Sequence, residues 1–176
     1  AVQATALLHQ AGVPKTCLQL LPGEGAVVGP VLCSAPNVSG VCFTGSTKTA
    51  QAINQIMAKN LAPHAPLIAE TGGLNAMIVD STALLEQAVQ DVVDSAFQSA
   101  GQRCSALRML YVQSDIADAF ERMLCGAMQA LVVGPPEAAN CDVGPLIDAA
   151  AQRRIAAHIA SHKILFQTSA PEKGYF

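Results

Sequence analysis

The sequence predicts an α/β fold in which parallel sheets are flanked by helices. Two observations lead to this expectation. Short apolar runs alternate with segments of helical spacing along the chain, and the runs are continuously apolar instead of alternating with polar residues. Such strands are typical of a parallel sheet buried between helices. We therefore expect strand–helix–strand units whose sheets are covered on both faces.

The N-terminal part alternates helix and strand in short steps. Alanine and leucine at helical spacing predict a helix over 4–11 that ends at a glycine. An apolar run predicts a buried strand over 17–21, which a Pro-Gly-Glu-Gly turn ends. A short helix is expected over 25–33, and a second apolar run predicts a strand over 38–43.

The middle of the chain contains the expected domain boundary. Ser46 is a suitable N-cap for a helix that stops near Asn60. Short buried strands are then expected over 67–69 and 76–79. The glycine pair at 72–73 lies between these strands, and we place the boundary there.

The C-terminal part repeats the alternation. Asp80 or Ser81 is the expected cap of a long helix, whose apolar doublets recur at helical spacing until Gly101. A strand is predicted over 107–112. The remaining expected elements are a helix capped by Ser114 that continues to Met128, a helix capped by Asp148 that includes Ile159, and a strand over 164–167.

Composition excludes several classes of function. The chain has 176 residues, of which 51% are hydrophobic and 13% charged, and its formal net charge is −3. This composition is typical of a well-buried globular protein. Because no run of lysine or arginine occurs, nucleic acid and anionic membranes are poor partners. No apolar stretch approaches the roughly 18 residues of a membrane span.

The cysteines do not suggest a metal site. None of the six forms a C-x-x-C pair, and the four histidines do not cluster with them, which argues against zinc. Free thiols in this number suit a reducing cytosol. Four cysteines lie among apolar residues and are expected to be small core residues: Cys17, Cys33, Cys42 and Cys125.

The stretch 101–106 presents a single cysteine, Cys104, between a predicted helix and a predicted strand. At such a junction a thiol can reach a cleft while backbone N–H groups remain free to donate. Cys104 can act as a nucleophile if Arg103 or the local backbone dipoles stabilise its thiolate. The alternative is a buried structural thiol.

Glu70 is a lone carboxylate at the end of an apolar run, and we expect it to be semi-buried. Apolar surroundings disfavour the charged form of a carboxyl group and suit a general base. The alternative is a strand-end glutamate that faces water. His64 could pair with Cys104 in a hydrolase, or it could be an exposed histidine of a proline-rich turn.

Two glycine-containing stretches could bind phosphate. Gly23, Gly25 and Gly29 follow a predicted strand with a spacing one residue longer than G-x-G-x-x-G, and they are either a dinucleotide loop or ordinary turn glycines. Gly45 and Ser46 join a strand to a helix N-terminus, where free N–H groups favour an anion. A plain helix cap explains Ser46 equally well.

Taken together, four ordered motifs resemble the aldehyde dehydrogenase superfamily. They are Leu-Pro-Gly at 21–23, Phe-Thr-Gly-Ser-Thr at 43–47, Glu-Thr-Gly-Gly-x-Asn at 70–75 and Gly-Gln-x-Cys at 101–104. The resemblance covers essentially the whole chain. Around Cys104 the sequence is most similar to the L-glutamate γ-semialdehyde (1-pyrroline-5-carboxylate) dehydrogenases, including the dehydrogenase region of bifunctional bacterial proline-utilisation flavoproteins.

This resemblance implies a mechanism. Cys104 would attack the aldehyde and form a thiohemiacetal, and transfer of hydride to NAD would leave a thioester that water activated by Glu70 hydrolyses. The Cys104 backbone N–H would supply half of an oxyanion hole. Ser105 would help to hold the α-carboxylate of the substrate. The reaction would convert L-glutamate γ-semialdehyde into L-glutamate in proline breakdown.

The resemblance also implies an NAD site. Ser46 would contact the pyrophosphate, Gly25 and Gly29 would let the adenosine end approach, and Gly45 and Gly72 would complete the set. No metal is implied. FAD is expected only if a proline dehydrogenase domain is present in the parent protein, which would be a homo-oligomer of the bacterial cytoplasm acting on a small aldehyde.

The expected fold is thus a partial Rossmann-like cofactor domain followed by a partial catalytic domain. Residues 1–71 would be the C-terminal part of the NAD-binding domain, and residues 72–176 the N-terminal part of the thiol-bearing domain. Thr71 replaces the more usual leucine of the family. The resemblance implies further parts that we expect outside these residues: the oxyanion-hole asparagine, the lysine and glutamate that bind the cofactor riboses, the substrate-anchoring loop and the dimerisation strand. The isolated segment is therefore expected to be inactive.

Two other functions remain open from the sequence. One is a thioester-forming hydrolase or acyltransferase that uses no nicotinamide. The other is a non-catalytic relative that serves as a structural or assembly domain. Failure to bind NAD would favour the first, and an unreactive, buried Cys104 would favour the second.

Overall fold

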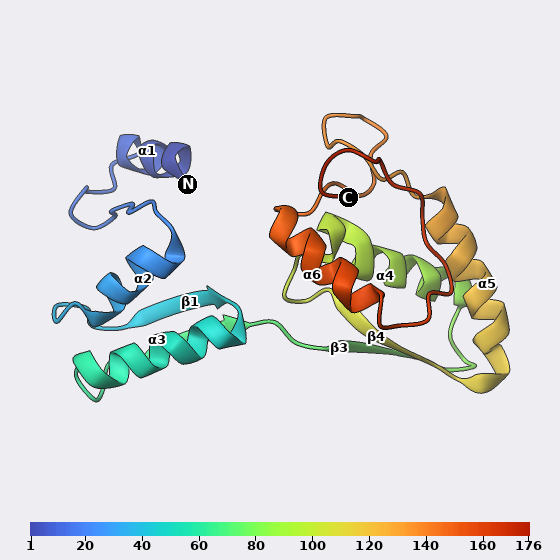
Figure 1. Ribbon diagram of the computed structural model, residues 1–176, viewed down its shortest axis with the longest axis horizontal. Coiled ribbons are helices and arrows are strands. Elements are labelled where there is room, and N and C mark those ends of the chain that lie inside the picture. The colour runs from blue at the N-terminus through green and yellow to red at the C-terminus, as the bar shows by residue number, and fades with distance from the viewer. The chain divides into compact units, whose positions relative to one another are not determined.

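The computed structural model describes residues 1–176 and divides into two compact units, Ala1–Thr71 and Gly72–Phe176. Each unit contains one pair of parallel strands joined through a helix (Figure 1). The expected α/β fold with parallel sheets flanked by helices is confirmed. No helix of the chain has both the length and the apolar character that crossing a membrane requires.

The first unit contains three helices and two strands, with helices before and after the first strand in the sequence. In chain order its elements are α1 (Val2–Gln10), α2 (Gly25–Ser34), β1 (Val41–Gly45), α3 (Thr47–Asn60) and β2 (Leu67–Thr71). Strands β1 and β2 pair in parallel, from Val41 opposite Leu67 to Gly45 opposite Thr71. Helix α3 provides the connection of more than ten residues that a parallel pair requires.

A small core holds the first unit together. Buried Cys33, Ile53 and Met57 come from α2 and α3, and they pack against partly buried residues of both strands. Along β1 the residues alternate between this core and solvent, so Cys42 is exposed. The sheet is therefore covered on one face within this chain, where the sequence predicts cover on both.

The second unit repeats the strand–helix–strand arrangement and adds two helices. Its elements are β3 (Asn75–Val79), α4 (Leu85–Phe97), a 3-10 turn (Gln98–Gly101), β4 (Leu107–Val112), α5 (Ser114–Ala130) and α6 (Ala149–Ile159). Strands β3 and β4 pair in parallel. Asn75 lies opposite Leu107 but Ala76 lies opposite Met109, so one residue of β4, Arg108, is extra at this point.

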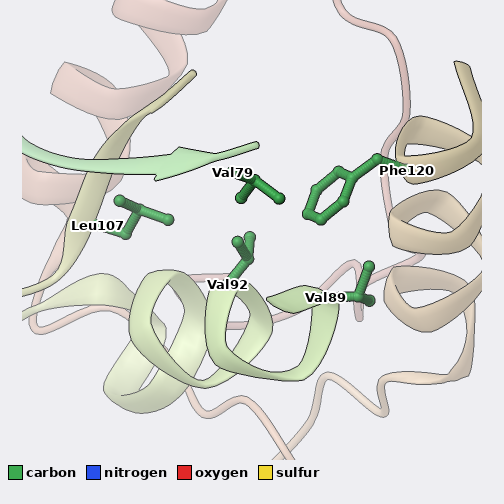
Figure 2. Packing of buried hydrophobic residues seen from close by; sticks show 5 residues of the cluster. All are labelled: Val79, Val89, Val92, Leu107 and Phe120. Carbon is green, nitrogen blue, oxygen red and sulfur yellow. The ribbon is translucent and has the colours of Figure 1, made fainter. Parts of the chain in front are cut away.

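The core of the second unit lies between its sheet and two helices. Val79 of β3 and Leu107 of β4 face Val89 and Val92 of α4, and Phe120 of α5 closes the cluster (Figure 2). Phe120 is only 1% exposed. The opposite face of β3 is bare, because Ile78 is 80% exposed. Helices again cover one face of the sheet within the chain.

Two predicted strands are wrong. Residues 17–21 begin in a turn, where the amides of Cys17 and Leu18 both donate to the carbonyl of Pro14, and no strand follows. Residues 164–167 form no strand either. Both runs are apolar, but no neighbouring strand offers them the ladder of hydrogen bonds that defines a strand.

Two predicted helix caps are also wrong, and two are confirmed. Neither Asp80 nor Ser81 caps α4, whose N-cap is Leu84. The Asp80 carboxylate instead accepts from Thr82 two residues later and forms a local turn. Ser114 is the first residue of α5 and not its cap. Ser46 and Asp148 do cap their helices, by accepting from the backbone N–H groups of Thr49 and Ala151.

Of the four cysteines expected in the core, one is fully buried. Cys33 is 5% exposed and Cys125 is half-buried, whereas Cys17 and Cys42 are exposed. Cys17 lies in the turn that replaces the first predicted strand, and Cys42 lies on the bare face of β1. Their apolar neighbours in sequence therefore do not surround them in space.

Candidate active site

Cys104 lies at the tip of a tight turn that leads into β4. The Ala106 N–H donates to the Arg103 carbonyl at 3.2 Å, which makes Cys104 and Ser105 the two central residues of a four-residue turn. Both are exposed. No hydrogen bond within the chain uses the N–H of Cys104 or of Ser105, so both groups are free to donate. We call residues 103–106 the cysteine turn.

One side chain reaches the cysteine turn from the neighbouring strand. The Asn75 amide nitrogen, at the start of β3, donates to the Cys104 carbonyl at 2.7 Å and to the Ala106 carbonyl at 2.9 Å. Asn75 is half-buried and Ala106 is fully buried. Both N–H bonds of this amide are therefore directed at the backbone of the turn.

The two arginines beside the cysteine hold the backbone and not the thiol. Arg103 Nη2 donates to the carbonyls of Asp94 and Ser95, at 3.0 and 3.2 Å, near the C-terminal end of α4. A cation at this end of a helix is favoured by the helix dipole. Arg103 Nε is buried without a hydrogen-bond partner. Arg108 Nη2 donates to the Gly101 carbonyl and closes the loop that contains the turn.

Gln102 joins the cysteine turn to a distant loop. Its amide nitrogen donates to the carbonyls of Ser99 and Pro145, at 3.1 and 3.2 Å, and its amide oxygen accepts from the Ile147 N–H at 2.8 Å. One side chain thus bridges segments more than forty residues apart in sequence. The Gly-Gln-x-Cys motif therefore contains a structural link as well as the thiol.

The approach to the turn uses left-handed backbone. Ser99, Ala100 and Gly101 have φ values of 56°, 54° and 64°. This region is unfavourable for residues with a Cβ atom. At Gly101 a Cβ would also lie 2.8 Å from the Ala96 carbonyl oxygen. Glycine is therefore required at 101 by both conformation and space.

Glu70 lies near the carboxyl end of β2 and belongs to the first unit, whereas Cys104 belongs to the second. Its side chain is exposed, so the expectation of a semi-buried carboxylate is wrong. Ile68 and Ala69, which precede it in β2, are exposed as well and do not enclose the carboxylate. Gly72 and Gly73 follow outside any strand, and nothing lies within 4 Å of the Cβ position at Gly72.

Gly45 and Ser46 lie where β1 turns directly into α3. The Ser46 hydroxyl accepts from the Thr49 N–H at 3.1 Å and lies 2.8 Å from the Thr49 hydroxyl, so it acts as a helix cap. The N–H groups of Thr47 and Lys48 have no partner within the chain. This helix N-terminus can therefore bind an anion in addition to being capped.

Gly25 and Gly29 line an apolar groove in the first unit. The groove has a volume of about 690 Å³ and is formed by α2, β1 and α3, with Thr49 among its lining residues. Nothing lies within 4 Å of the Cβ position at either glycine. The structure thus brings two of the glycines selected from the sequence to one groove, and it places Gly23 outside the lining.

The remaining candidates have simpler explanations. His64 is an exposed residue of a turn. The rings of His158 and His162 lie with centroids 4.5 Å apart and planes tilted by 45°, at the end of α6. No three histidine, cysteine, aspartate or glutamate side chains lie close enough to hold a metal ion.

The hydrogen bonds from Asn75 were not expected from the sequence. In the sequence, Asn75 stands out only as the last residue of the Glu-Thr-Gly-Gly-x-Asn motif. The available signal was a polar side chain at the first position of a strand, directly after a glycine-rich link. That signal does not specify which backbone groups the amide contacts, because they lie 29 and 31 residues away.

Known proteins resemble the chain over most of its length. The model of the aldehyde dehydrogenase family matches residues 1–165. The bifunctional protein PutA of Klebsiella aerogenes is 53% identical over 162 residues, which are 90% of this chain and 12% of that protein. The mitochondrial delta-1-pyrroline-5-carboxylate dehydrogenase of Emericella nidulans is 32% identical over 165 residues, 89% of this chain and 29% of that protein.

The fold is similar to solved structures as well. A crystal structure of a Bradyrhizobium japonicum proline utilization A (PutA) variant superposes with a TM-score of 0.94 and 49% identity, covering 99% of this chain and 18% of that one. The resemblance inferred from the four motifs and the expected aldehyde-dehydrogenase-like architecture are both confirmed. The chain belongs to the aldehyde dehydrogenase family.

Proposed function

We propose that this chain supplies the thiol-bearing region of an NAD-dependent dehydrogenase that oxidises L-glutamate γ-semialdehyde to L-glutamate. The observation that supports this most is the cysteine turn, which exposes Cys104 on a tethered backbone with two free N–H groups beside it. Membership of an aldehyde dehydrogenase family supports the reaction type. Similarity to PutA proteins and to a delta-1-pyrroline-5-carboxylate dehydrogenase supports the substrate and a role in proline breakdown.

In the proposed reaction the Cys104 thiolate adds to the aldehyde carbon and forms a thiohemiacetal. The free N–H of Cys104 donates to the oxygen on which negative charge develops, as half of an oxyanion hole. Loss of hydride from the thiohemiacetal leaves a thioester. Glu70 removes a proton from water, and the resulting hydroxide attacks the thioester. The C–S bond breaks, so that the carboxylate product leaves and the Cys104 thiolate is restored. Ser105 helps to hold the α-carboxylate of the substrate.

Residues of the first unit are compatible with NAD. The apolar groove with Gly25 and Gly29 suits an adenosine group. The α3 N-terminus, with Gly45 and Ser46 at its entrance, suits a pyrophosphate. Gly72 is proposed to complete the set. When bound, NAD supplies the hydride acceptor that the reaction requires.

The remaining proposals concern the complete protein. The chain spans 12% of the length of the Klebsiella aerogenes relative, so activity is expected of the longer protein and not of these residues alone. We propose a homo-oligomer of the bacterial cytoplasm. FAD is required only if a proline dehydrogenase domain is part of the same protein. We propose that the complete protein acts on a small aldehyde and that this segment binds no nucleic acid.

The deciding experiment measures NADH formation from glutamate semialdehyde by the full-length protein that contains this chain. Cys104→Ala is expected to reduce the rate to background, because the nucleophile is lost. Cys17→Ala is the matched control, since Cys17 is also an exposed thiol in a turn, and it is expected to retain activity. Glu70→Gln is expected to release one equivalent of NADH and then stall before thioester hydrolysis.

Each alternative function predicts a different result. A protein that forms the thioester without binding NAD would be a hydrolase or acyltransferase. A folded full-length protein with an unreactive Cys104 and no activity would be a structural or assembly domain. Activity in the isolated 176-residue chain would show that the residues considered indispensable outside it are not required.

A further inference from the structure

We infer that Asn75 is a positioning residue for Cys104, which it orients by fixing the peptide plane between Cys104 and Ser105. The inference rests on the proposed function and adds a residue to it. Asn75 contacts backbone only, so it is not placed among the reacting groups. Asn75 affects the thiol only indirectly, by holding the backbone of the cysteine turn.

The contacted peptide is the middle peptide of the turn. Cys104 and Ser105 are its central residues, and the plane between them can point in two opposite directions, which distinguish type I from type II turns. The turn hydrogen bond from Ala106 to Arg103 is present in both arrangements. The bond from Asn75 to the Cys104 carbonyl, at 2.7 Å, selects one of them.

Selecting that orientation also directs the neighbouring N–H group. In a trans peptide the N–H points opposite to the C=O. With the Cys104 carbonyl turned toward Asn75, the Ser105 N–H points away from the Asn75 amide. The Arg103 carbonyl is already engaged by Ala106, which fixes the plane that carries the Cys104 N–H. Both free donors beside the thiol thus acquire defined directions.

No other side chain performs this task. The hydrogen bonds of Gln102, Arg103 and Arg108 all end on backbone groups outside the Cys104–Ser105 peptide. They hold the approach to the turn, whereas Asn75 holds the turn itself. Its second bond, to the buried Ala106 carbonyl at 2.9 Å, fixes the amide group. An amide with both N–H bonds engaged cannot rotate away without losing two hydrogen bonds.

The test compares Asn75→Ala and Asn75→Asp with Asn60→Ala and Asn60→Asp in the full-length protein. Asn60 is a matched control because its side-chain amide also donates to a backbone carbonyl, that of Ile56 at 2.8 Å within α3. Aspartate keeps the shape of asparagine but has no N–H to donate. Kinetics with glutamate semialdehyde and hydrogen exchange of the peptide covering 101–108 are measured for each variant.

We expect kcat to fall roughly 10- to 100-fold in both Asn75 variants, because small misplacements of a reacting group are costly. The KM for NAD should stay within about twofold, because uniform binding is unaffected. Exchange of the Ala106 amide should become about tenfold faster as the turn loosens. The Asn60 variants should show none of these changes. A purely structural role would lower the melting temperature without this separation of kcat from KM.

Asn75→Ser is included because its hydroxyl can still donate to one of the two carbonyls. We expect a kcat between those of the wild type and the alanine variant, and this variant remains informative if the other two do not fold. The inference would be overturned by any folded Asn75 variant whose kcat and whose hydrogen-exchange rate at the Ala106 amide both equal those of the wild type. If the wild type itself lacks dehydrogenase activity, the proposed function fails, and the exchange measurement alone then decides whether Asn75 holds the turn.

Discussion

The two strand–helix–strand units of the chain carry their candidate residues at opposite ends of their strands. In the first unit, Gly45 and Glu70 lie at the carboxyl ends of β1 and β2, and Ser46 follows β1 directly. In the second, Asn75 begins β3 and Cys104 lies in the turn before β4, at the amino ends. Ligands of parallel α/β sheets bind outside the carboxyl ends of the strands. Gly45 and Ser46 follow that rule, whereas Cys104 does not.

The difference is reflected in how each site is held. At the carboxyl end of β1 a helix begins at once, and its first N–H groups provide donors with one capping hydroxyl as support. No helix N-terminus serves the cysteine turn. Asn75 bonds to its backbone, and Gln102, Arg103 and Arg108 hold the approach to it. The nucleophile therefore depends more strongly on tertiary contacts than the candidate cofactor site does.

The largest expected effect is at the approach to the cysteine turn. Gly101→Ala places a Cβ in left-handed backbone and 2.8 Å from the Ala96 carbonyl, and the conformational strain alone should cost about 1–3 kcal/mol. The free energy of unfolding, measured with denaturant, checks this prediction.

Gly126→Ala is the matched substitution for that experiment. Gly126 lies inside α5 with nothing within 4 Å of its Cβ position, so alanine should stabilise the protein by about 0.5–1 kcal/mol. The two substitutions are thus expected to have opposite signs. Equal effects would mean that the left-handed approach to Cys104 imposes no special requirement.

A smaller effect is expected at the carboxyl end of β1. Ser46→Ala removes the α3 cap and should cost about 0.5–2 kcal/mol of stability. It should also weaken NAD binding, measured by titration of the full-length protein, if this helix N-terminus binds the pyrophosphate. Ser34→Ala removes a hydroxyl that only donates to the Val31 carbonyl in α2, and it should leave both quantities unchanged. Unaltered NAD affinity in the Ser46 variant would remove the proposed pyrophosphate contact.

The smallest effect concerns the carboxyl end of β3, where an aspartate turn replaces a helix cap. The Thr82 hydroxyl and then the Thr82 N–H donate to the carboxylate, and they hold the pKa of Asp80 below its ordinary value of 3.8. A carboxyl group whose pKa is depressed by folding stabilises the folded protein at pH values above its ordinary pKa. This contribution is lost as the pH falls through the lowered pKa of the folded state.

Melting temperatures of the wild type and of Asp80→Asn should therefore differ at neutral pH and converge as the pH falls below 3.8. Thr82→Val removes the hydroxyl that contributes most, so it should reduce the difference that Asp80→Asn makes. A separation of the two melting curves that stays constant on acidification would contradict the assignment.

The sequence was sufficient where the determinants of structure are local. Helical spacing and capping residues correctly located α3 and α6, including the caps Ser46 and Asp148. The strand over 107–112 was predicted with its observed bounds. The apolar run at 17–21 forms no strand because an apolar run becomes a strand only when a neighbouring strand pairs with it, and local patterns do not reveal that neighbour.

The same limit applies to the candidate site. The position of Cys104 in a turn between helix and strand follows from the glycine and small residues around it. The exposure of Glu70 does not follow from its apolar neighbours, because alternate residues of β2 face opposite sides of the sheet. The link from Asn75 to the cysteine turn requires that β3 and β4 already lie side by side.

The link from Asn75 has a consequence for folding. Its two hydrogen bonds join residues 29 and 31 positions apart, and helix α4 must cross between them before they can form. Contacts of such sequence separation require prior closure of a loop and form late in folding. A nascent or partly folded chain would therefore contain an ordinary flexible cysteine at position 104, and the thiol would acquire its defined presentation only when the strand pair is complete.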